Sequence, residues 1–442
     1  GRGRGSSMAY PYRHEKETRV LSEHFGNPDA RRLEWWRQQG GYEAFGKALE
    51  GGPDAVIDTV KESGLRGRGG AGFPTGVKWS FMPKEPSRPS YLVVNADESE
   101  PGAFKDRELL RWTPHLLIEG CLIGAYAIRA AHVYIYIRGE FFEAAQILAR
   151  AIEEAYAAGL LGQDILGSGV AIDMTLHVGA GAYICGEETG LMNSLEGRRG
   201  QPRVKPPFPA AVGAFGMPTT VNNVETLCAV PHIVKNGAAW YRQWGTEKST
   251  GTKLFNMSGH LVRRGNFELP LGFPLKELIY DVCGGIRDGR KLKAVIPGGS
   301  SVPILRWDEI DIAMDYESVA QAGTMLGPAS VIVMDDRTNL IKQVRRIVDF
   351  YAHESCGQCT PCREGTTWMG QIMMRIERGR GRPEDIDTLL ELSRNMTGTT
   401  ICVLSDSCGA PVVSSIQKFP EDYQALIPDW SPAQVAEPAA VA

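Results

Sequence analysis

The sequence predicts an α/β protein of more than one domain, because three stretches of the chain differ in hydrophobic pattern. Between about residues 55 and 240, helical patterns alternate with short apolar runs, which is typical of a parallel sheet covered by helices. From about 250 to 335, short alternating segments surround one short helix, which indicates a small α+β module. The remainder has a helical pattern and contains three closely spaced cysteines.

These patterns divide the 442 residues into five regions, a number that suits a chain too long for one hydrophobic core. We expect a helical lead-in over 1–54, an α/β domain over 55–245, an α+β module over 246–335, a helical region over 336–428 and a disordered tail over 429–442.

The individual elements follow from short sequence runs. In the α/β domain we expect strands at "YLVVN" (91–95), "VYIYI" (133–137) and "MTLHV" (174–178). In the α+β module, "KLFNMSG", "GNFELPLG" and "KAVIPGG" read as strands, and "PLKELIYDVCGG" reads as a helix closed by glycine. The last region opens with a helix, since Leu340, Val344, Ile347 and Tyr351 recur at helical spacing.

Composition narrows the class of protein. A hydrophobic content of 43%, a charged content of 23% and a net charge of -4 are typical of a globular protein with no attraction to nucleic acid. The most apolar long stretch is interrupted by Glu119, Arg129 and His132, so we expect no membrane-spanning helix. The N-terminus lacks the apolar core of a secretory signal, so the nine cysteines point to metal binding or buried thiols rather than disulfides.

A cysteine run in "ESCGQCTPCREG" indicates a metal centre. Cys356, Cys359 and Cys362 follow a C-x2-C-x2-C spacing, which suits three corners of a [4Fe-4S] cluster better than a zinc site, although zinc and unligated thiols remain alternatives. A ferredoxin pattern would place the next cysteine at position 366, which is Thr. The fourth ligand must therefore come from a distant segment.

A glycine-rich stretch, "GLRGRGGAGFPTGVKW", is either a plain turn or a phosphate-binding loop. Gly67, Gly69 and Gly72 satisfy G-x-G-x-x-G, but a helix rather than a strand is expected before them, unlike an ordinary dinucleotide fingerprint. The nearby cations of Arg66, Arg68 and Lys78 favour a phosphate-binding loop. Phe73 and Phe81 are either core residues or exposed rings that stack on a nucleotide base.

Two further loops follow predicted strands, where ligands bind in open α/β sheets. The first, "NADESEPGAFKDR", offers Asn95, Asp97, Glu98 and Glu100 to the hydroxyls of a ribityl or ribose group, or else forms a solvated acidic surface. The second, "GAGAYICGEETGLMNSLEG", holds Glu187 and Glu188, which are alternatively helix caps. We interpret Cys185 in this loop as a buried thiol.

Five motifs together resemble one family, the NADH-binding flavoprotein subunit of respiratory complex I (type I NADH:quinone oxidoreductase). They are "RGRGGAGFPTG", "NADESEPG", "GAGAYICGEET", "PTTVNNVET" and "ESCGQCTPCREG", and the resemblance covers about residues 40 to 425. It implies a Rossmann-like FMN and NADH domain, a ubiquitin-like β-grasp (SLBB) module and a C-terminal helical bundle with one [4Fe-4S] cluster. The homologous modules of NAD-reducing hydrogenases and NAD-linked formate dehydrogenases commonly carry an extra segment in front, where this chain has only about fifty residues.

The resemblance also assigns site residues. For FMN it implies Gly67, Arg68, Gly69, Lys78, Asn95, Asp97, Glu98, Tyr183, Gly186, Glu187, Asn222, Asn223 and Thr226, with Gly72 completing the glycine motif. For NADH it implies Phe73, Phe81, Glu100, Glu188, Lys205 and Phe208. Hydride transfer from NADH to a flavin needs no protein nucleophile, so the protein supplies stacking, orientation and electrostatics. We expect Glu100 and Glu188 to orient the nicotinamide, and the acidic side chains to disfavour NADPH.

For the fourth cluster ligand, Cys402 and Cys408 are the two candidates in the helical region. Cys402 follows the turn after a predicted helix at about 384–395 and matches the ligand of the family, whereas Cys408 departs from the family pattern and is expected in the next helix.

The expected partners are other peripheral-arm subunits of complex I, including a thioredoxin-like [2Fe-2S] subunit and a large iron-sulfur subunit, with neither nucleic acid nor direct membrane insertion. We expect a cytoplasmic location at the inner membrane, or the matrix side in a mitochondrion. The alternatives are a diaphorase subunit of a hydrogenase or formate dehydrogenase, and a non-enzymatic scaffold stabilised by zinc.

Overall fold

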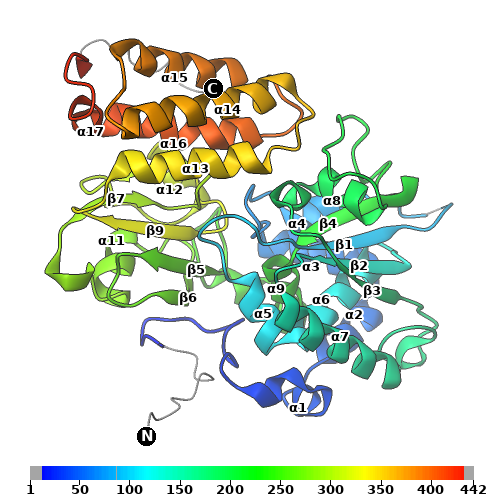
Figure 1. Cartoon of the computed structure of the whole chain (residues 1–442). Helices are drawn as coiled ribbons and strands as arrows, with labels where there is room; N and C mark the ends of the chain where they lie inside the picture. The colour runs from blue at the N-terminus through cyan, green and yellow to red at the C-terminus, as the bar shows by residue number, and fades with distance from the viewer. Residues whose placement is uncertain (1–11, 86, 433–442) are drawn as a thin grey trace, which may run out of the picture.

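The structure, a computed structural model, describes residues 12–85 and 87–432. It contains a domain built on a parallel sheet, a second domain built on a mixed sheet, and a bundle of helices that lies over the second domain (Figure 1). Residues 1–11 of the expected lead-in and most of the expected tail lie outside the described residues. Trp430 is buried against Tyr423 of the bundle, so the expected tail boundary at 429 is too early.

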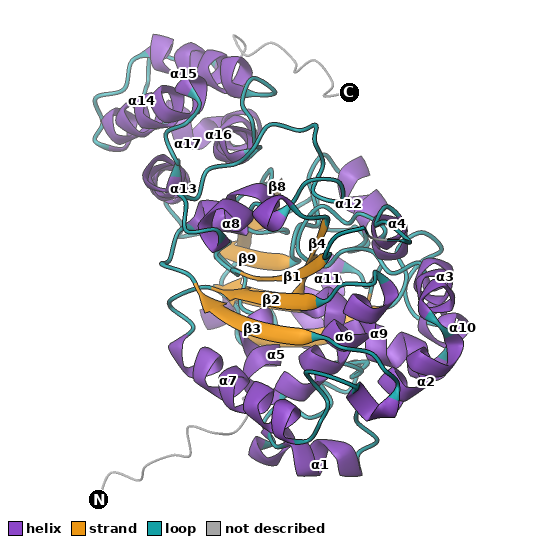
Figure 2. Cartoon of the chain, turned by 90° about the vertical axis from the view of Figure 1, so that its right-hand side faces the viewer, coloured by secondary structure: helices purple, strands orange, loops and turns teal. Residues whose placement is uncertain are grey.

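The first domain has four parallel strands in the order β3-β2-β1-β4. They are β1 (Tyr91–Ala96), β2 (His132–Ile137), β3 (Asp173–Val178) and β4 (Thr219–Asn223). The first three confirm the predicted strands, whereas β4 escaped prediction because "TTVNN" is polar. Since all four run in one direction, their carboxyl ends meet at one edge (Figure 2).

Helices surround this sheet. They are α1 (Leu33–Gln38), α2 (Glu43–Gly51), α3 (Pro53–Ser63), α4 (Thr75–Ser80), α5 (Asp106–Trp112), α6 (Pro114–Ala127), α7 (Phe142–Ala157), α8 (Glu188–Leu195), α9 (Val224–Asn236) and α10 (Ala238–Arg242). The apolar stretch noted in the sequence forms α6, which is buried almost throughout, and then β2. A side chain at Gly120 would lie 2.1 Å from the Leu227 carbonyl oxygen, so this glycine lets α6 pack closely on α9. None of the described helices is both long and apolar enough to cross a membrane.

The second domain is a five-stranded mixed sheet in the order β6-β5-β9-β7-β8. The strands are β5 (Thr252–Gly259), β6 (Gly265–Pro270), β7 (Leu292–Ile296), β8 (Leu305–Arg306) and β9 (Ser330–Asp335). Its helices are α11 (Leu275–Glu277), which continues into a π-helix at Leu278–Val282, and α12 (Tyr316–Gln321). Phe255, Phe267 and Leu278 lie in a hydrophobic core that belongs to this domain, which confirms the predicted α+β module.

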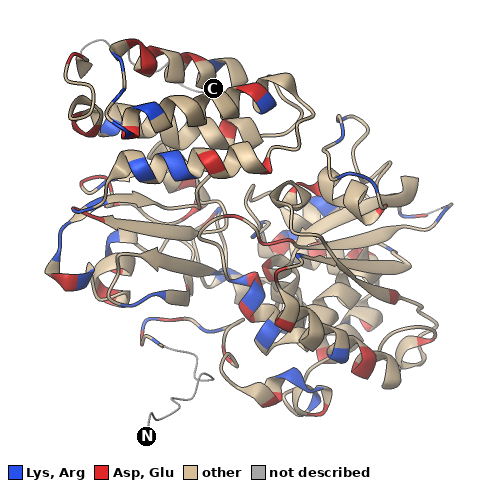
Figure 3. Ribbon diagram, in the orientation of Figure 1, with Lys and Arg blue, Asp and Glu red and all other residues tan. Residues whose placement is uncertain are grey.

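The bundle contains α13 (Leu340–Glu354), α14 (Thr360–Glu377), α15 (Pro383–Met396), α16 (Leu404–Lys418) and the short α17 (Pro420–Gln424). The predicted helices at 340–351 and 384–395 are α13 and α15. The outer face of α13 carries charges of both signs (Figure 3), while Leu340, Val344 and Tyr351 are buried on its inner face.

Candidate functional site

A cavity of about 250 Å³ lies where the three structural units meet. It is lined by Gly69, Asn95, Asp97, Glu98, Ser99, Glu100, Ala103, Lys105, Asp106, Tyr183, Ile184, Gly186, Glu187, Asn223, Pro328, Cys402, Val403, Leu404 and Ser407. The strand order reverses between β1 and β4, so this position is the topological switch point of the parallel sheet, where ligands bind in such folds.

Two polar side chains at the end of β1 form one wall. The Asn95 amide donates to the Gly186 carbonyl at 2.8 Å, and its oxygen accepts from the Asp97 backbone N–H at 3.1 Å. Asp97 Oδ1 accepts from the Ser99 hydroxyl at 2.9 Å, whereas Asp97 Oδ2 is buried without a hydrogen-bond partner. Burial raises the pKa of Asp97 to about 7. An unpaired buried acceptor beside a cavity fits a ligand rich in hydroxyl groups, such as the ribityl chain of FMN.

The glycine-rich loop forms the opposite wall. A side chain at Gly69 would come within 3.0 Å of the Asn223 side chain, so only glycine lets the loop approach Asn223 closely. The guanidinium of Arg68 turns away into the protein, where it donates to the Tyr241 hydroxyl at 2.9 Å and the Thr250 carbonyl at 2.6 Å. Arg68 therefore shapes the loop, and its side chain does not line the cavity.

Glu98 organises the loop that follows β1. Its carboxylate accepts from the backbone N–H groups of Lys105, Asp106 and Arg107 at 2.8, 3.0 and 3.1 Å. Burial, together with the charge of Asp106, raises the pKa of Glu98 to about 7. This carboxylate folds the loop that lines the cavity.

Glu100 joins all three units. Its carboxylate accepts from the Tyr183 hydroxyl at 2.8 Å and from the Ser301 N–H at 2.9 Å, in the loop after β7. Ser300 donates to it at 3.3 Å and is within 2.9 Å of the Tyr351 hydroxyl on α13. Burial raises the pKa of Glu100. Sequence reasoning missed these partners, because Ser300 and Ser301 lie 200 and 201 residues away from Glu100 along the chain.

The predicted helix-cap role of Glu187 is present in the structure. Its Oε2 accepts from the N–H groups of Thr189 and Gly190, both at 2.9 Å, at the start of α8. Glu188 instead faces Lys78 at 3.2 Å and Lys205 at 2.5 Å. Burial opposes ionisation of Glu188, but the two lysines outweigh it, so the pKa of this carboxyl is lowered.

The remaining predicted residues divide into buried and exposed groups. Asn222 accepts from the Trp79 indole at 2.8 Å, and the Thr226 hydroxyl accepts from the Arg68 N–H at 2.8 Å, so both support the walls from behind. Phe73, Phe81 and Phe208 are 49%, 60% and 61% exposed, and the first two rings lie 6.2 Å apart. All three rings are exposed outside the cavity, and Phe73 and Phe81 lie next to each other.

The predicted cysteines converge at one end of the bundle. Cys356 lies in the loop between α13 and α14, Cys359 caps α14, Cys362 lies in its first turn, and Cys402 lies in the turn before α16. The Ile401 N–H contacts Cys359 Sγ at 3.4 Å. Cys356, Cys359 and Cys402 pack against the same hydrophobic core that contains Cys362. Burial raises the pKa of Cys402 to about 11.

A [4Fe-4S] cluster takes one thiolate on each of its four irons, and these four thiols supply that donor set. Among the residues that the structure describes, no group of three His, Cys, Asp or Glu side chains is placed to hold a single metal ion. Cys408 lies within α16 and is fully buried, as expected of a packed thiol.

Several lining residues were not predicted individually. Lys105 and Asp106 stand in the quoted loop "NADESEPGAFKDR", and their position after a strand was the available signal. Pro328, Val403, Leu404 and Ser407 come from the second domain and the bundle, and only the tertiary structure brings them to the cavity.

Comparison with known proteins supports this arrangement. A family described as the Nuo51 FMN-binding domain matches residues 60–232, an SLBB domain matches 253–333, and the NADH-ubiquinone oxidoreductase-F iron-sulfur binding region matches 342–426. The chain therefore has an FMN-binding domain, an SLBB domain and a helical region for a [4Fe-4S] cluster.

Full-length relatives match as well. The F subunit of the NADH-quinone oxidoreductase of Mycobacterium bovis is 52% identical over 93% of this chain and 94% of its own length. The corresponding F subunit of Rickettsia bellii is 51% identical over 93% and 99%. An NAD+-reducing [NiFe]-hydrogenase structure superimposes with a TM-score of 0.81 at 36% identity, covering 95% of this chain and 70% of the hydrogenase chain. The chain belongs to the family of the NADH-quinone oxidoreductase F subunits, the NADH-oxidising subunits that carry FMN and a [4Fe-4S] cluster.

Proposed function

We propose that the cavity between β1, β4 and the glycine-rich loop is the FMN site of this NADH dehydrogenase subunit, and that Cys356, Cys359, Cys362 and Cys402 hold its cluster. When bound, FMN accepts a hydride from NADH and releases the electrons one at a time to the cluster. The observation that carries this proposal is that Cys402 and its neighbours Val403 and Leu404 line the same cavity as Asn95 and Asp97. Cofactors bound there lie next to each other, as rapid electron transfer needs.

In this proposal the cavity residues bind and orient FMN. Asp97 Oδ2 accepts a hydrogen bond from one of its hydroxyl groups, Asn95 holds Asp97 and Gly186 in place, and Gly69 leaves room for a close approach of backbone N–H groups. Lys78 lies near this wall, with its ammonium 2.8 Å from the Val221 carbonyl and 3.2 Å from Glu188. Its positive charge suits an anionic ligand.

NADH would approach from the surface that carries Phe73, Phe81 and Phe208. The Glu188 carboxylate is held ionised by Lys78 on one side and Lys205 on the other. Glu100, bonded to Tyr183 and Ser301, is fixed in place rather than mobile. Two carboxylates held in place in this way can orient a nicotinamide ribose and repel an additional phosphate.

The test is purification and reconstitution of the chain with FMN, iron and sulfide. We expect a yellow-brown protein with flavin and thiolate-to-iron absorption that reduces ferricyanide with NADH, and acid precipitation should release the flavin. A colourless zinc protein without NADH oxidation would instead support the scaffold alternative. Flavin that stays with the acid precipitate would contradict a non-covalent site.

As a family member, the chain works in an oxidoreductase complex with other subunits. We infer that a thioredoxin-like [2Fe-2S] subunit and a large iron-sulfur subunit receive its electrons at the cytoplasmic face of the inner membrane, or the matrix face in a mitochondrion. The structural likeness to the NAD+-reducing hydrogenase keeps a diaphorase role as a second candidate. Native co-purification decides between them, since quinone-linked subunits support the first role and hydrogenase subunits the second.

A further inference from the structure

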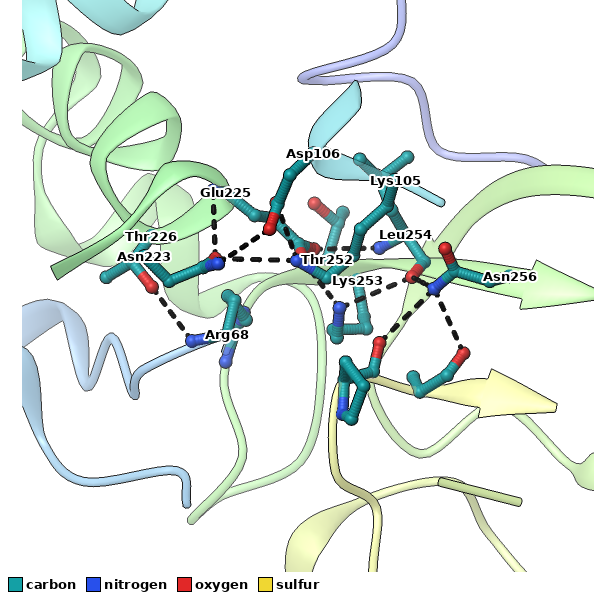
Figure 4. A network of polar contacts seen from close by, with 12 residues as sticks. Arg68, Lys105, Asp106, Asn223, Glu225, Thr226, Thr252, Lys253, Leu254 and Asn256 are labelled. Carbon is teal, nitrogen blue, oxygen red and sulfur yellow. Dashed lines mark hydrogen bonds and ion pairs between the residues drawn. The ribbon is translucent and has the colours of Figure 1, made fainter. Parts of the chain in front are cut away.

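A series of buried charges runs from the flavin cavity to the SLBB domain (Figure 4). Lys105 and Asp106 lie at the start of α5, Glu225 lies in the first turn of α9, and Lys253 lies in β5. The exposed fractions of these side chains are 1%, 4%, 0% and 0%. Four buried ionisable groups in contact need a reason, because each is costly to remove from water.

The contacts form one continuous series. Lys253 Nζ lies 2.5 Å from Glu225 Oε2, the same oxygen lies 2.9 Å from Lys105 Nζ, and Lys105 Nζ lies 2.7 Å from Asp106 Oδ1. The series ends at the cavity on Asn223, whose amide donates to Asp106 Oδ2 at 2.7 Å. The nitrogen and the oxygen of the Asn223 amide both form hydrogen bonds, since Oδ1 accepts from Lys105 Nζ at 3.4 Å and from the Glu225 N–H at 3.0 Å. The charges therefore fix the side chain that faces the glycine-rich loop.

The SLBB domain holds the neighbouring backbone too. Asn256 of β5 accepts from the Phe104 N–H at 2.7 Å, and Asn266 of β6 donates to the Phe104 carbonyl at 3.0 Å. The Asn256 amide also contacts the carbonyl of Pro328, a cavity residue, at 3.3 Å. Hydrogen bonds thus hold one wall of the cavity against the SLBB domain, although this domain contributes only Pro328 to the lining.

The signs of the charges explain what Lys253 adds. Lys253 and Lys105 balance Glu225 and Asp106, so these four groups together are neutral. Without Lys253, these groups would carry one excess negative charge in a buried region beside the cavity. That excess would disfavour an anionic ligand and would disfavour adding electrons to it.

We propose that Lys253 is a positioning residue of the flavin site, through which the SLBB domain holds Asn223 in place and keeps the cavity wall electrically neutral for an anionic, electron-accepting ligand. This inference rests on the proposed location of FMN. Lys253 acts through Glu225 and Lys105 and does not itself touch the cavity.

The surroundings of Lys253 also make its charge dependent on pH. Lys253 faces Glu225 of α9, Lys105 at the start of α5 and Arg68 of the glycine-rich loop. Burial lowers the pKa of Lys253 to about 7, although Glu225 opposes this fall. Lys253 therefore loses its proton at a lower pH than an ordinary lysine, whereas an arginine at this position would stay charged.

The experiment compares Lys253→Met and Lys253→Arg with a matched control, Lys293→Met. Lys293 also lies in the SLBB domain and pairs with an acidic residue of the bundle, Asp422, at 2.6 Å, but neither residue lines the cavity. The measurements are the FMN dissociation constant of flavin-free protein, by fluorescence titration, and the midpoint potential of the bound flavin, both at pH 6. Circular dichroism checks that each variant is folded.

We expect Lys253→Met to raise the FMN dissociation constant about tenfold and to make the potential more negative, because the excess negative charge disfavours an anionic ligand and added electrons. Lys253→Arg should stay within about threefold of wild type, since it keeps the charge. Lys293→Met should match wild type. A folded Lys253→Met protein with unchanged affinity and potential would overturn the proposal.

The double variant Glu225→Gln/Lys253→Met separates charge from shape. It removes one charge of each sign, so we expect its potential to lie closer to wild type than that of Lys253→Met alone. A double variant as far from wild type as the single one would mean that only the structure of the pair matters, which contradicts the proposal.

Should Lys253→Met fail to fold, the pH dependence decides. Between pH 6 and pH 9 the FMN dissociation constant of wild type should rise relative to that of Lys253→Arg, because only the lysine loses its charge. Parallel curves would overturn the inference. Wild-type protein that binds no FMN would refute the proposed flavin site, whereas normal binding with unaltered variants would refute only the role of Lys253.

Discussion

At the scale of single residues, the cavity wall combines side chains that are satisfied by the protein with one that is not. Glu98, Glu187 and Asn95 form hydrogen bonds with backbone groups of the protein, and these bonds fix the conformation of the loops. Asp97 differs, since one of its oxygens is buried and unpaired. A protein retains such a group where a ligand completes its hydrogen bonds.

The substitution Asp97→Asn should therefore act in opposite directions on stability and binding. In flavin-free protein it removes a buried unpaired carboxylate, so the free energy of unfolding should rise by about 1–3 kcal/mol at pH 7.5. FMN affinity should fall about tenfold or more, because an amide cannot replace both acceptors. Denaturant unfolding and fluorescence titration measure the two effects, with the exposed Asp311→Asn as control.

The stability gain should depend on pH. The pKa of Asp97 is raised from 3.8 to about 7 in the folded chain, so the folded state binds the proton more tightly than the unfolded state. The carboxylate therefore costs no stability below pH 4, an increasing amount between pH 4 and 7, and its full amount above pH 7. A gain from Asp97→Asn that is equal at pH 4 and pH 8 would contradict this account.

The sequence identified many residues of the site but did not always predict what their side chains do. Asn95, Asp97 and Glu98 could be found because they follow an apolar strand, and the position of a strand is legible from its pattern. The inward orientation of the Arg68 side chain could not be predicted, because its partners Tyr241 and Thr250 lie more than 170 residues away in the sequence. The Lys253 contact with Glu225 was equally invisible, since a lysine in a strand ordinarily predicts a solvent-facing position.

At the scale of elements, the turn between α15 and α16 brings Cys402 to the end of the bundle that carries Cys356, Cys359 and Cys362. Gly398 adopts a left-handed conformation, with φ of 70°. The Thr399 hydroxyl donates to the Asn395 carbonyl in the last turn of α15, and the Thr400 hydroxyl donates to the Cys402 carbonyl. Cys402 is thereby presented before α16 begins, whereas Cys408 is already buried in that helix. The sequence predicted that Cys402 lies in a turn and Cys408 in the helix that follows. It could not predict that the loop with Cys356 and the turn with Cys402 lie at the same end of the bundle.

Cys402→Ala and Cys408→Ala test this assignment. We expect Cys402→Ala to lose the cluster, seen as lost iron and a lost EPR signal of the reduced protein. Cys408→Ala should keep both and lose about 1 kcal/mol of stability from the vacated volume. The reverse pattern, a cluster lost with Cys408 and kept without Cys402, would transfer the fourth ligand to Cys408.

The exposed rings on the glycine-rich loop and on the residue that follows α4 allow a separate test of the NADH surface. Phe73→Ala and Phe81→Ala should each raise the KM for NADH by about 2- to 10-fold, as loss of an aromatic stack does, and leave FMN content unchanged. The assay is NADH:ferricyanide turnover with flavin measured in parallel. Phe142→Ala, which removes a ring that is 71% exposed near the start of α7, serves as the control. Equal loss of flavin and turnover would place these rings in the FMN site.

At the scale of the whole molecule, the cavity belongs to no single domain. The parallel-sheet domain supplies most of the wall, the SLBB domain supplies Pro328, and the bundle supplies Cys402, Val403, Leu404 and Ser407. Glu100 ties the same three units together through Tyr183, Ser301 and Ser300, and Ser300 reaches Tyr351 of α13. The domains and the fold class could be predicted from the sequence. A cavity shared by several domains depends on how the domains pack, and hydrophobic periodicity does not predict that packing.

A ligand in a shared cavity should stabilise all the units that form it. At a concentration 100 times its dissociation constant, FMN adds about 2.7 kcal/mol to the stability of the state that binds it. We expect hydrogen exchange, measured by mass spectrometry on cluster-containing protein, to slow on FMN addition in peptides covering 95–106, around Pro328 and in 402–407. The distant end of the bundle, α17, is the internal control. Slower exchange confined to 95–106 would mean that the parallel-sheet domain binds FMN alone, and the adjacency of Cys402 to the flavin, on which the proposed electron path depends, would then be wrong.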